Sequence, residues 1–223
     1  MKFPFEEALA KVRADLVDLA NYLSFLGAAI LLTLAPGPDN MYILTKSLSA
    51  GPRQGVTLAM GLATGPLWHT LLVMAGVAAF IQSSPAAFMV LKYCGAAYLL
   101  YLSYGAFRSK GASIKAGDVV DKSESFALYK RGFLMNASNP KVLLFFLAIL
   151  PQFVQPNGFL SPSLQIGLLG LTFSIQAAIL FSIAAICAGQ LKDTLIRHES
   201  FPLIMSRVEG TLLLLIAIGL MFL

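Results

Sequence analysis

The stretch Leu34-Ala35-Pro36-Gly37-Pro38-Asp39-Asn40 interrupts the first long apolar run of the sequence. The hydrocarbon run before it, residues 23–35, is shorter than the roughly twenty residues that a helix needs to cross a bilayer core. The run therefore has to continue into residues 41–44, which places the interruption at membrane depth. Two prolines around a glycine break the helical hydrogen-bond ladder, and such backbone occurs in a membrane only where it is buried in protein or lines a cavity. The stretch therefore predicts a broken helix and a functional site.

The composition predicts an integral membrane protein. Of the 223 residues, 57% are hydrophobic and only 12% are charged, which is too few charges for a soluble protein of this size. The formal net charge of +5 does not indicate nucleic-acid binding. The basic residues cluster in loops between apolar runs, where they determine the orientation of a membrane protein.

Six apolar runs predict six transmembrane helices, at approximately residues 21–45, 54–81, 86–107, 128–151, 161–189 and 205–223. Residues 109–127, rich in Gly, Ser and mixed charges, form a linker between a first three-helix repeat at 21–108 and a second at 128–223. Residues 1–20 have apolar side chains at helical spacing, which predicts an amphipathic helix at the membrane interface. The expected fold is an all-α polytopic membrane protein.

The two halves are predicted to be inverted copies of each other. Asn136-Ala137-Ser138-Asn139-Pro140-Lys141 in the fourth run matches the interruption in the first, because each is a polar break around proline followed by Leu, Ile or Phe. Each half has three spans, so the second half enters the membrane upside down relative to the first. Interrupted helices at corresponding positions of inverted halves are the best pointer in a sequence to the binding site of a transporter.

The distribution of Lys and Arg predicts the orientation. The loops after the first, third and fifth spans contain Lys and Arg, whereas the loops after the second and fourth spans and the carboxyl end contain none. By the positive-inside rule, the three basic loops are cytoplasmic and both termini lie outside.

Asp39 and Lys141 each follow a proline at equivalent breaks, so an inverted fold should bring them close together at the middle of the membrane. Pro38 and Pro140 suit the first position of a half-helix, and Asn139 suits the N-cap of the second. A carboxylate is favoured in the first turn of a helix, whereas a cation there is unfavourable and needs compensation.

These residues predict a site for a zwitterion. Lys141 and free helix amides would hold a carboxylate, while Asp39 and three side-chain amides would hold an ammonium group or a proton; the amides are those of Asn40, Asn136 and Asn139. In the alternative interpretation, Asp39 and Lys141 only neutralise each other as a structural ion pair. His69, midway along the second span, is compatible with a proton relay and with a hydrogen-bonded packing role.

Five motifs carry a resemblance to a known family. They are Pro36–Asn40, Ser47–Gly55, Gly61–His69, Leu91–Leu99 and Gly132–Lys141. Together they resemble the lysine-exporter family, and more closely its homoserine/threonine-efflux (RhtB-type) branch, over most of the chain from about residue 20 onward. The resemblance implies a secondary transporter of the bacterial inner membrane that exports amino acids or close derivatives by proton exchange and alternating access, without a cofactor.

Three other classes of protein compete with this one. A passive channel is possible, although the inverted breaks favour alternating access over an open pore. An enzyme is disfavoured because no nucleophile has an adjacent base, and the histidines, His69 and His198, do not form a His-Glu-x-x-His motif. An exporter of metal ions or small anions on the same scaffold is the alternative, and it would be expected to contain acidic, histidine or thiol clusters in its spans. We therefore predict no metal site. The expected partners are an amino acid, membrane lipid and a second copy of the chain, and nucleic acid is not expected.

Overall fold

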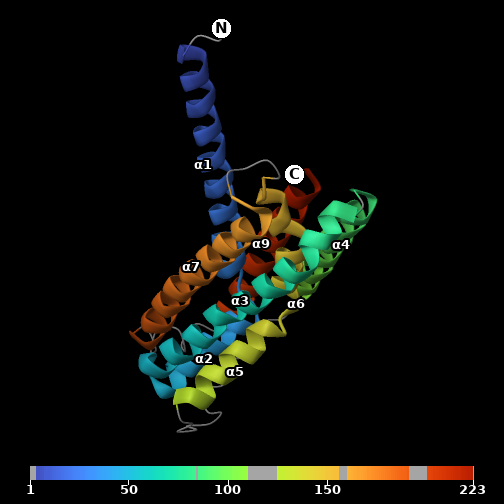
Figure 1. Ribbon diagram of the computed structural model, residues 1–223. Helices are drawn as coiled ribbons and strands as arrows, with labels where there is room; N and C mark the ends of the chain where they lie inside the picture. Colours follow the sequence, from blue (N-terminus) through green and yellow to red (C-terminus); the bar gives the residue numbers. More distant parts are fainter. Residues whose placement is uncertain (1–3, 84, 110–124, 156–159, 191–199, 223) are drawn as a thin grey trace.

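The computed structural model describes residues 4–83, 85–109, 125–155, 160–190 and 200–222 (Figure 1). Every regular element within these residues is helical, which confirms the all-α class. The linker expected at residues 109–127 lies almost entirely outside the described residues.

The first apolar run is a broken helix, as predicted. α1 (Pro4–Leu34) is followed by α2 (Pro38–Ala50), and the two are bent by 56° relative to each other. Gly37 between them is extended, with φ −157° and ψ −170°. The N–H of Met41 begins the ladder of α2 by donating to the carbonyl of Gly37 at 2.9 Å.

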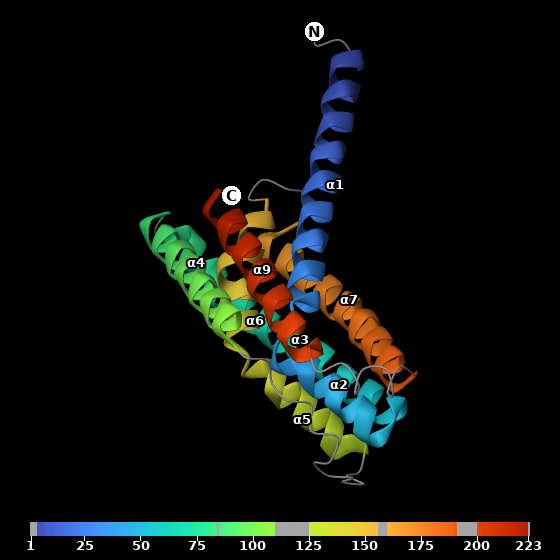
Figure 2. The ribbon, with the colours of Figure 1, turned by 180° about the vertical axis from the view of Figure 1, so that it is seen from behind.

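α1 is one helix, and this corrects the predicted boundary at residue 20. We expected residues 1–20 to form a separate helix along the membrane surface, but α1 is continuous from Pro4 to Leu34. Figures 1 and 2 show that the first part of α1 projects away from the other helices, in line with the later part of the same helix. A helix that lay on the surface and then crossed the membrane would need a bend, so the amphipathic stretch is the first part of α1.

The fourth run is broken too. α5 (Ser125–Ala137) is bent by 49° from the segment Pro140–Phe153. That segment consists of α6 (Pro140–Leu144), a π-helical turn, η1 (Phe145–Ile149), and a 3-10 turn, η2 (Leu150–Phe153). A π-helical turn inside a helix is rare and is frequently found at functional sites.

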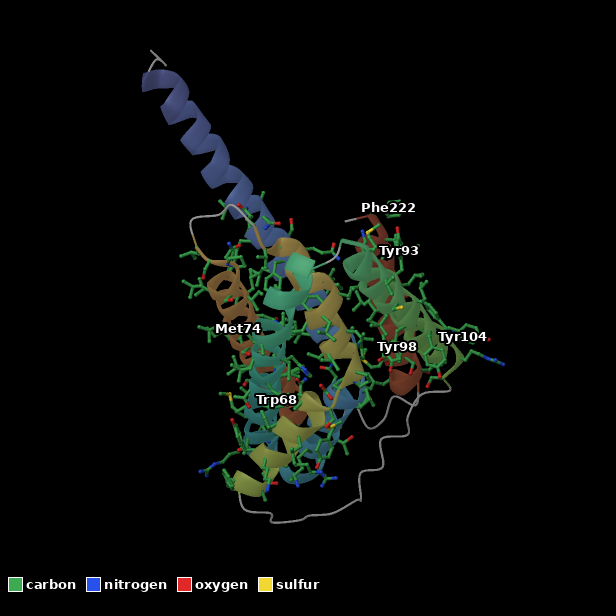
Figure 3. The ribbon with its side chains drawn as sticks, turned by 45° about the vertical axis from the view of Figure 1, so that its right-hand side comes forward. Trp68, Met74, Tyr93, Tyr98, Tyr104 and Phe222 are labelled. Atoms are coloured by element: carbon green, nitrogen blue, oxygen red, sulfur yellow. The ribbon has the colours of Figure 1, made fainter. Side chains whose placement is uncertain are left out.

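The helices form two groups. α3 (Pro52–Ser83) packs against α2, α5 and α7 (Pro162–Gln190), while α4 (Pro85–Arg108) packs against α9 (Phe201–Phe222). Figure 3 shows the α4–α9 pair, marked by Tyr93, Tyr98, Tyr104 and Phe222, beside the α3 group, marked by Trp68 and Met74. The pairs α3–α7 and α4–α9 each join two spans that would correspond in an inverted repeat. The first pair joins the second and fifth spans, and the second pair joins the third and sixth.

Glycines allow α3 and α5 to approach each other closely. A Cβ atom on Gly61 would collide with the backbone carbonyl of Tyr129, and one on Gly132 would lie 2.5 Å from the carbonyl of Leu58. This close crossing holds α5 against the centre of α3, next to the second break.

Three helical segments are long and apolar enough to cross a membrane: Pro52–Gly76, Pro162–Gln190 and Leu203–Phe222. Each bent pair adds one more if it is counted as a single span, which gives up to five among the described residues. The expected span at residues 86–107 coincides with α4, a helix of 24 residues, but is not among these five. The six-span inverted repeat therefore stays a prediction. α1 begins and α9 ends toward the same end of the molecule (Figures 1 and 2).

Candidate functional site

The two helix breaks meet at the Asp39 carboxylate. Asn136 and Asn139 both donate through Nδ2 to Asp39 Oδ2, at 2.8 Å and 3.0 Å. Asn136 is the penultimate residue of α5 and Asn139 precedes α6, so Asp39 joins the beginning of α2 to both sides of the second break. The structure thus brings the two breaks together, and Asp39 and Lys141, the predicted neighbours, line one cavity between them.

Asp39 lies in the first turn of α2, where Pro38 occupies the first helical position. The backbone N–H groups of this turn have no carbonyl partner in the helix, and the positive end of the helix dipole favours a negative charge there. The side chain is only 4% exposed. A buried carboxylate in this position is stabilised by the helix and by two amide donors.

Asn139 is the N-cap of α6, as predicted. Its Oδ1 accepts a hydrogen bond from the backbone N–H of Lys141 at 3.0 Å, and Pro140 occupies the first helical position. Its Nδ2 is the group that binds Asp39. One side chain therefore both begins the second half-helix and ties it to the first.

Lys141 reaches across to the end of α1. Its Nζ donates to the carbonyl oxygen of Ala35 at 2.9 Å, and the side chain is 7% exposed. The carboxyl end of a helix carries partial negative charge, so this carbonyl supplies the compensation that a cation in the first turn of α6 requires. In the described part of the chain, no direct ion pair joins Lys141 to Asp39, although their charges interact. A simple structural ion pair does not describe the site.

Asn40 stabilises the end of α1. Its Nδ2 donates to the carbonyl oxygens of Thr33 at 3.1 Å and Ala35 at 3.0 Å. These carbonyls have no partner within α1, because the helix ends there. The predicted role of the Asn40 amide in an ammonium site stays a prediction, since an ammonium group would bind its oxygen and not the nitrogen. The Asn40 side chain nevertheless lines the cavity described below.

His69 supports the second break from α3. Its Nε2 lies 3.1 Å from the carbonyl oxygen of Asn136, and its ring packs 5.8 Å from that of Phe146. The side chain is fully buried and does not line the cavity. This geometry places His69 behind Asn136, and its role in proton relay stays a prediction.

The helix-break residues fall into two pairs. Pro36 and Gly37 are buried, whereas Pro38 and Pro140, which begin the two half-helices, are exposed.

A small cavity lies between the two breaks. It has a volume of about 10 Å³, roughly the space that one water molecule needs. Its walls come from both breaks, from α1 and from α7, and include Asp39, Asn40, Asn136 and Lys141. Asp39 Oδ1 and Asn136 Oδ1 are buried and accept no hydrogen bond from the described residues. The cavity thus presents one free carboxylate oxygen, Asp39 Oδ1, and the Lys141 side chain, whereas Asn136 Oδ1 lies against Gly65 of α3. Its helices must move before the site can hold an amino acid.

Sequence reasoning missed two polar residues near this site. Gln176 of α7 is buried, and its Nε2 donates to Thr33 Oγ1 at 2.8 Å. Glu209 of α9 approaches Gly37: a Cβ atom on that glycine would lie 3.1 Å from both Glu209 Oε1 and Lys141 Nζ. Both are long polar side chains in otherwise apolar helices, and such residues in a membrane usually face the protein interior. That rule could have identified them.

Comparison with known proteins gives the family. The model of the LysE type translocator family matches residues 30–223. An uncharacterised membrane protein of Vibrio cholerae serotype O1 is 32% identical over 194 residues, which cover 86% of this chain and 91% of that protein. The leucine efflux protein of Salmonella typhimurium is 34% identical over 138 residues, which cover 60% of this chain and 63% of that protein. No solved structure matches the chain.

The family match includes both helix breaks and all the residues around the cavity. It confirms the family resemblance read from the sequence motifs, and the descriptions of the relatives are those of membrane and efflux proteins. The chain belongs to the LysE type translocator family.

Proposed function

We propose that this protein exports amino acids or close derivatives across the bacterial inner membrane by alternating access, in exchange for protons. The observation that carries the proposal is the cavity between the two breaks, because both the Asp39 carboxylate and the Lys141 side chain line it and Asp39 Oδ1 accepts no hydrogen bond from the described residues. An acid and a base that do not neutralise each other directly match the two charges of a zwitterion.

The substrate's ammonium group would be held by Asp39 Oδ1, which accepts no hydrogen bond from the described residues. Its carboxylate would be held by Lys141 Nζ, in place of the Ala35 carbonyl. Charge-assisted hydrogen bonds of this kind are about twice as strong as neutral ones. The name of the Salmonella relative, leucine efflux protein, supports an amino acid as the substrate.

Alternating access follows from the size of the cavity. A volume of about 10 Å³ cannot hold an amino acid, so the conformation described here is closed around the site. The bends of 56° and 49° provide two points where half-helices can change their angle without breaking regular hydrogen bonds. The basic loops would face the cytoplasm, from which an exporter loads.

Cells fed dipeptides that release leucine, threonine or lysine provide the test. Cells that produce the protein should have smaller internal pools of at least one of these amino acids than cells with an empty vector. Asp39→Asn should abolish the difference, because it removes the charge that holds the ammonium group. Arg207→Gln, which removes an exposed charge on α9, is the matched control and should export normally.

Protein amount and melting temperature are measured for each variant, so that loss of folding is recognised. Equal pools with and without the wild-type protein, at full expression, would contradict amino-acid export. Normal export by Asp39→Asn would remove Asp39 from the proposal.

A further inference from the structure

A second pocket lies on the other side of the first break. It has a volume of about 190 Å³ and is formed by the break, the beginning of α9 and the end of α4; its walls include Pro36, Gly37, Met41, Met205 and Glu209. It shares no residue with the small cavity around Asp39. This pocket is large enough for a small organic molecule, and its walls combine apolar side chains with one carboxylate.

The Glu209 carboxylate forms part of the wall of this pocket. The side chain is half-buried, and no described residue donates a hydrogen bond to it or forms a direct ion pair with it. The charge it feels most strongly is that of Lys141, which points instead at the Ala35 carbonyl. A carboxylate that is partly removed from water and left without a donor is a site for a cation.

Glu209 and Lys141 approach Gly37 on the side where a side chain would be. Glu209 Oε1 and Lys141 Nζ both lie 3.1 Å from the point that a Cβ atom of this residue would occupy. The missing side chain therefore leaves one space that an acid and a base both face. Lys141 also lines the closed cavity together with Asp39, so the same side chain contributes to both spaces.

We propose that this pocket is a loading site for primary amines and zwitterionic amino acids, in which Glu209 binds the ammonium group of the ligand. The carboxylate of an amino acid would turn toward Lys141 across Gly37, and the apolar side chain would lie against Met41 and Met205. The ligand would then pass the glycine to reach Asp39. This inference rests on the proposed export function, because it makes the pocket the first of two sites along one path.

The position of the pocket fits loading from the cytoplasm. Ser109, at the end of α4, forms part of its wall and is the first residue of the linker that the charge distribution assigns to the cytoplasmic side. Substrate of an exporter has to bind first on that side. The small Asp39 cavity, by contrast, is enclosed between the two breaks.

The test uses the full chain in lipid nanodiscs, with Cys94 and Cys187 replaced by alanine because both are exposed thiols. Met205→Cys then places a single reactive thiol at the wall of the pocket. Three probes are compared: leucine, 3-methylbutylamine, which lacks the carboxylate, and 4-methylpentanoate, which lacks the ammonium group. The rate of maleimide labelling reports whether a probe occupies the pocket.

We expect leucine and 3-methylbutylamine to slow the labelling. Glu209→Gln should raise the concentration of each that gives half-maximal protection by about tenfold or more, the effect of one lost charge-assisted contact. Any protection by 4-methylpentanoate should not change. Arg207→Gln, an exposed charge on the same helix, is the matched control and should leave all three curves unchanged.

Gly37→Ala gives a second variant that does not touch a charge. The backbone at this residue is extended, so alanine is tolerated there, but its methyl group would fill the space between Glu209 and Lys141. It should therefore weaken protection by leucine while the protein stays folded.

Equal protection by leucine with and without Glu209→Gln would overturn the loading site. So would a thiol that leucine never protects in a protein that exports leucine from cells, and that result would leave the proposed function intact. Absence of export together with protection that depends on Glu209 would have the opposite meaning: the pocket would bind amines, and the export function would be wrong.

Discussion

At the scale of single residues, the site between the two helix breaks is built by a few polar side chains that each make two kinds of contact. Asn139 caps α6 with its oxygen and binds Asp39 with its nitrogen, and Asn40 satisfies carbonyls at the end of α1 while it lines the cavity. The cap at Asn139 could be predicted from the sequence, because Asn followed by Pro is a local signal that needs no tertiary information. Glu209 could not be placed in this way, because its approach to Gly37 depends on how α9 packs.

The double task of Asn139 leads to a stability prediction. Asn139→Ala removes both the helix cap and one of the two hydrogen bonds to the buried Asp39 carboxylate, which together should cost about 1–3 kcal/mol. Ser138→Ala is the control, because Ser138 is exposed and its hydroxyl donates to the carbonyl of Leu134 in the preceding helix, not to the other break. Thermal unfolding in detergent should show a lower melting temperature for Asn139→Ala alone. Equal melting temperatures for the two variants would mean that the two breaks are not coupled through this side chain.

At the scale of helices, the breaks were predictable and their exact continuation was not. Pro36, Pro38 and Pro140 remove backbone donors, so the ends of α1 and α5 follow from local rules. The π-helical turn η1 has no such signal: Phe145 and Phe146 in it pack against Phe173 at 5.4 Å and 5.1 Å between ring centroids. Those ring contacts form only when α7 packs against this segment, so the sequence alone does not predict the π-helical turn. The continuity of α1 was missed because the amphipathic pattern of residues 1–20 was interpreted as a separate element.

The close approach of α3 and α5 gives a prediction for this scale. Gly61→Ala places a methyl group against the backbone carbonyl of Tyr129, which cannot rotate away as a side chain would. The helices would have to separate, at a cost of about 1–3 kcal/mol. Gly76→Ala on the same helix is the control, because no described atom lies within 4 Å of its Cβ position, and alanine there should stabilise the helix by about 0.5–1 kcal/mol.

Melting temperatures in detergent check this pair. Gly61→Ala should melt lower than the wild type and Gly76→Ala at the same temperature or higher. If both variants behaved alike, the α3–α5 crossing would be looser than the structure shows.

At the scale of the whole molecule, the proposed path for substrate runs along the boundary between the two groups of helices. The larger pocket lies where the α4–α9 pair meets the first break, and the small cavity lies where the two breaks meet each other. In the proposed alternating access, a relative movement of the two groups opens one of these two spaces while it closes the other. The sequence predicted that the two breaks would come together. The division into an α4–α9 pair and an α3 group was not predicted, because it depends on contacts between helices that are far apart in the sequence.

The central claim is that Asp39 binds the ammonium group of a dipolar substrate. Counterflow of radiolabelled leucine in proteoliposomes tests it most directly, because exchange of labelled for unlabelled substrate requires binding and translocation but no proton gradient. The claim predicts that Asp39→Asn lowers the counterflow by about tenfold or more, since it removes a charge-assisted contact, while Arg207→Gln leaves it unchanged. Counterflow by Asp39→Asn at the wild-type rate would contradict the claim and leave Asp39, at most, a role in coupling to protons.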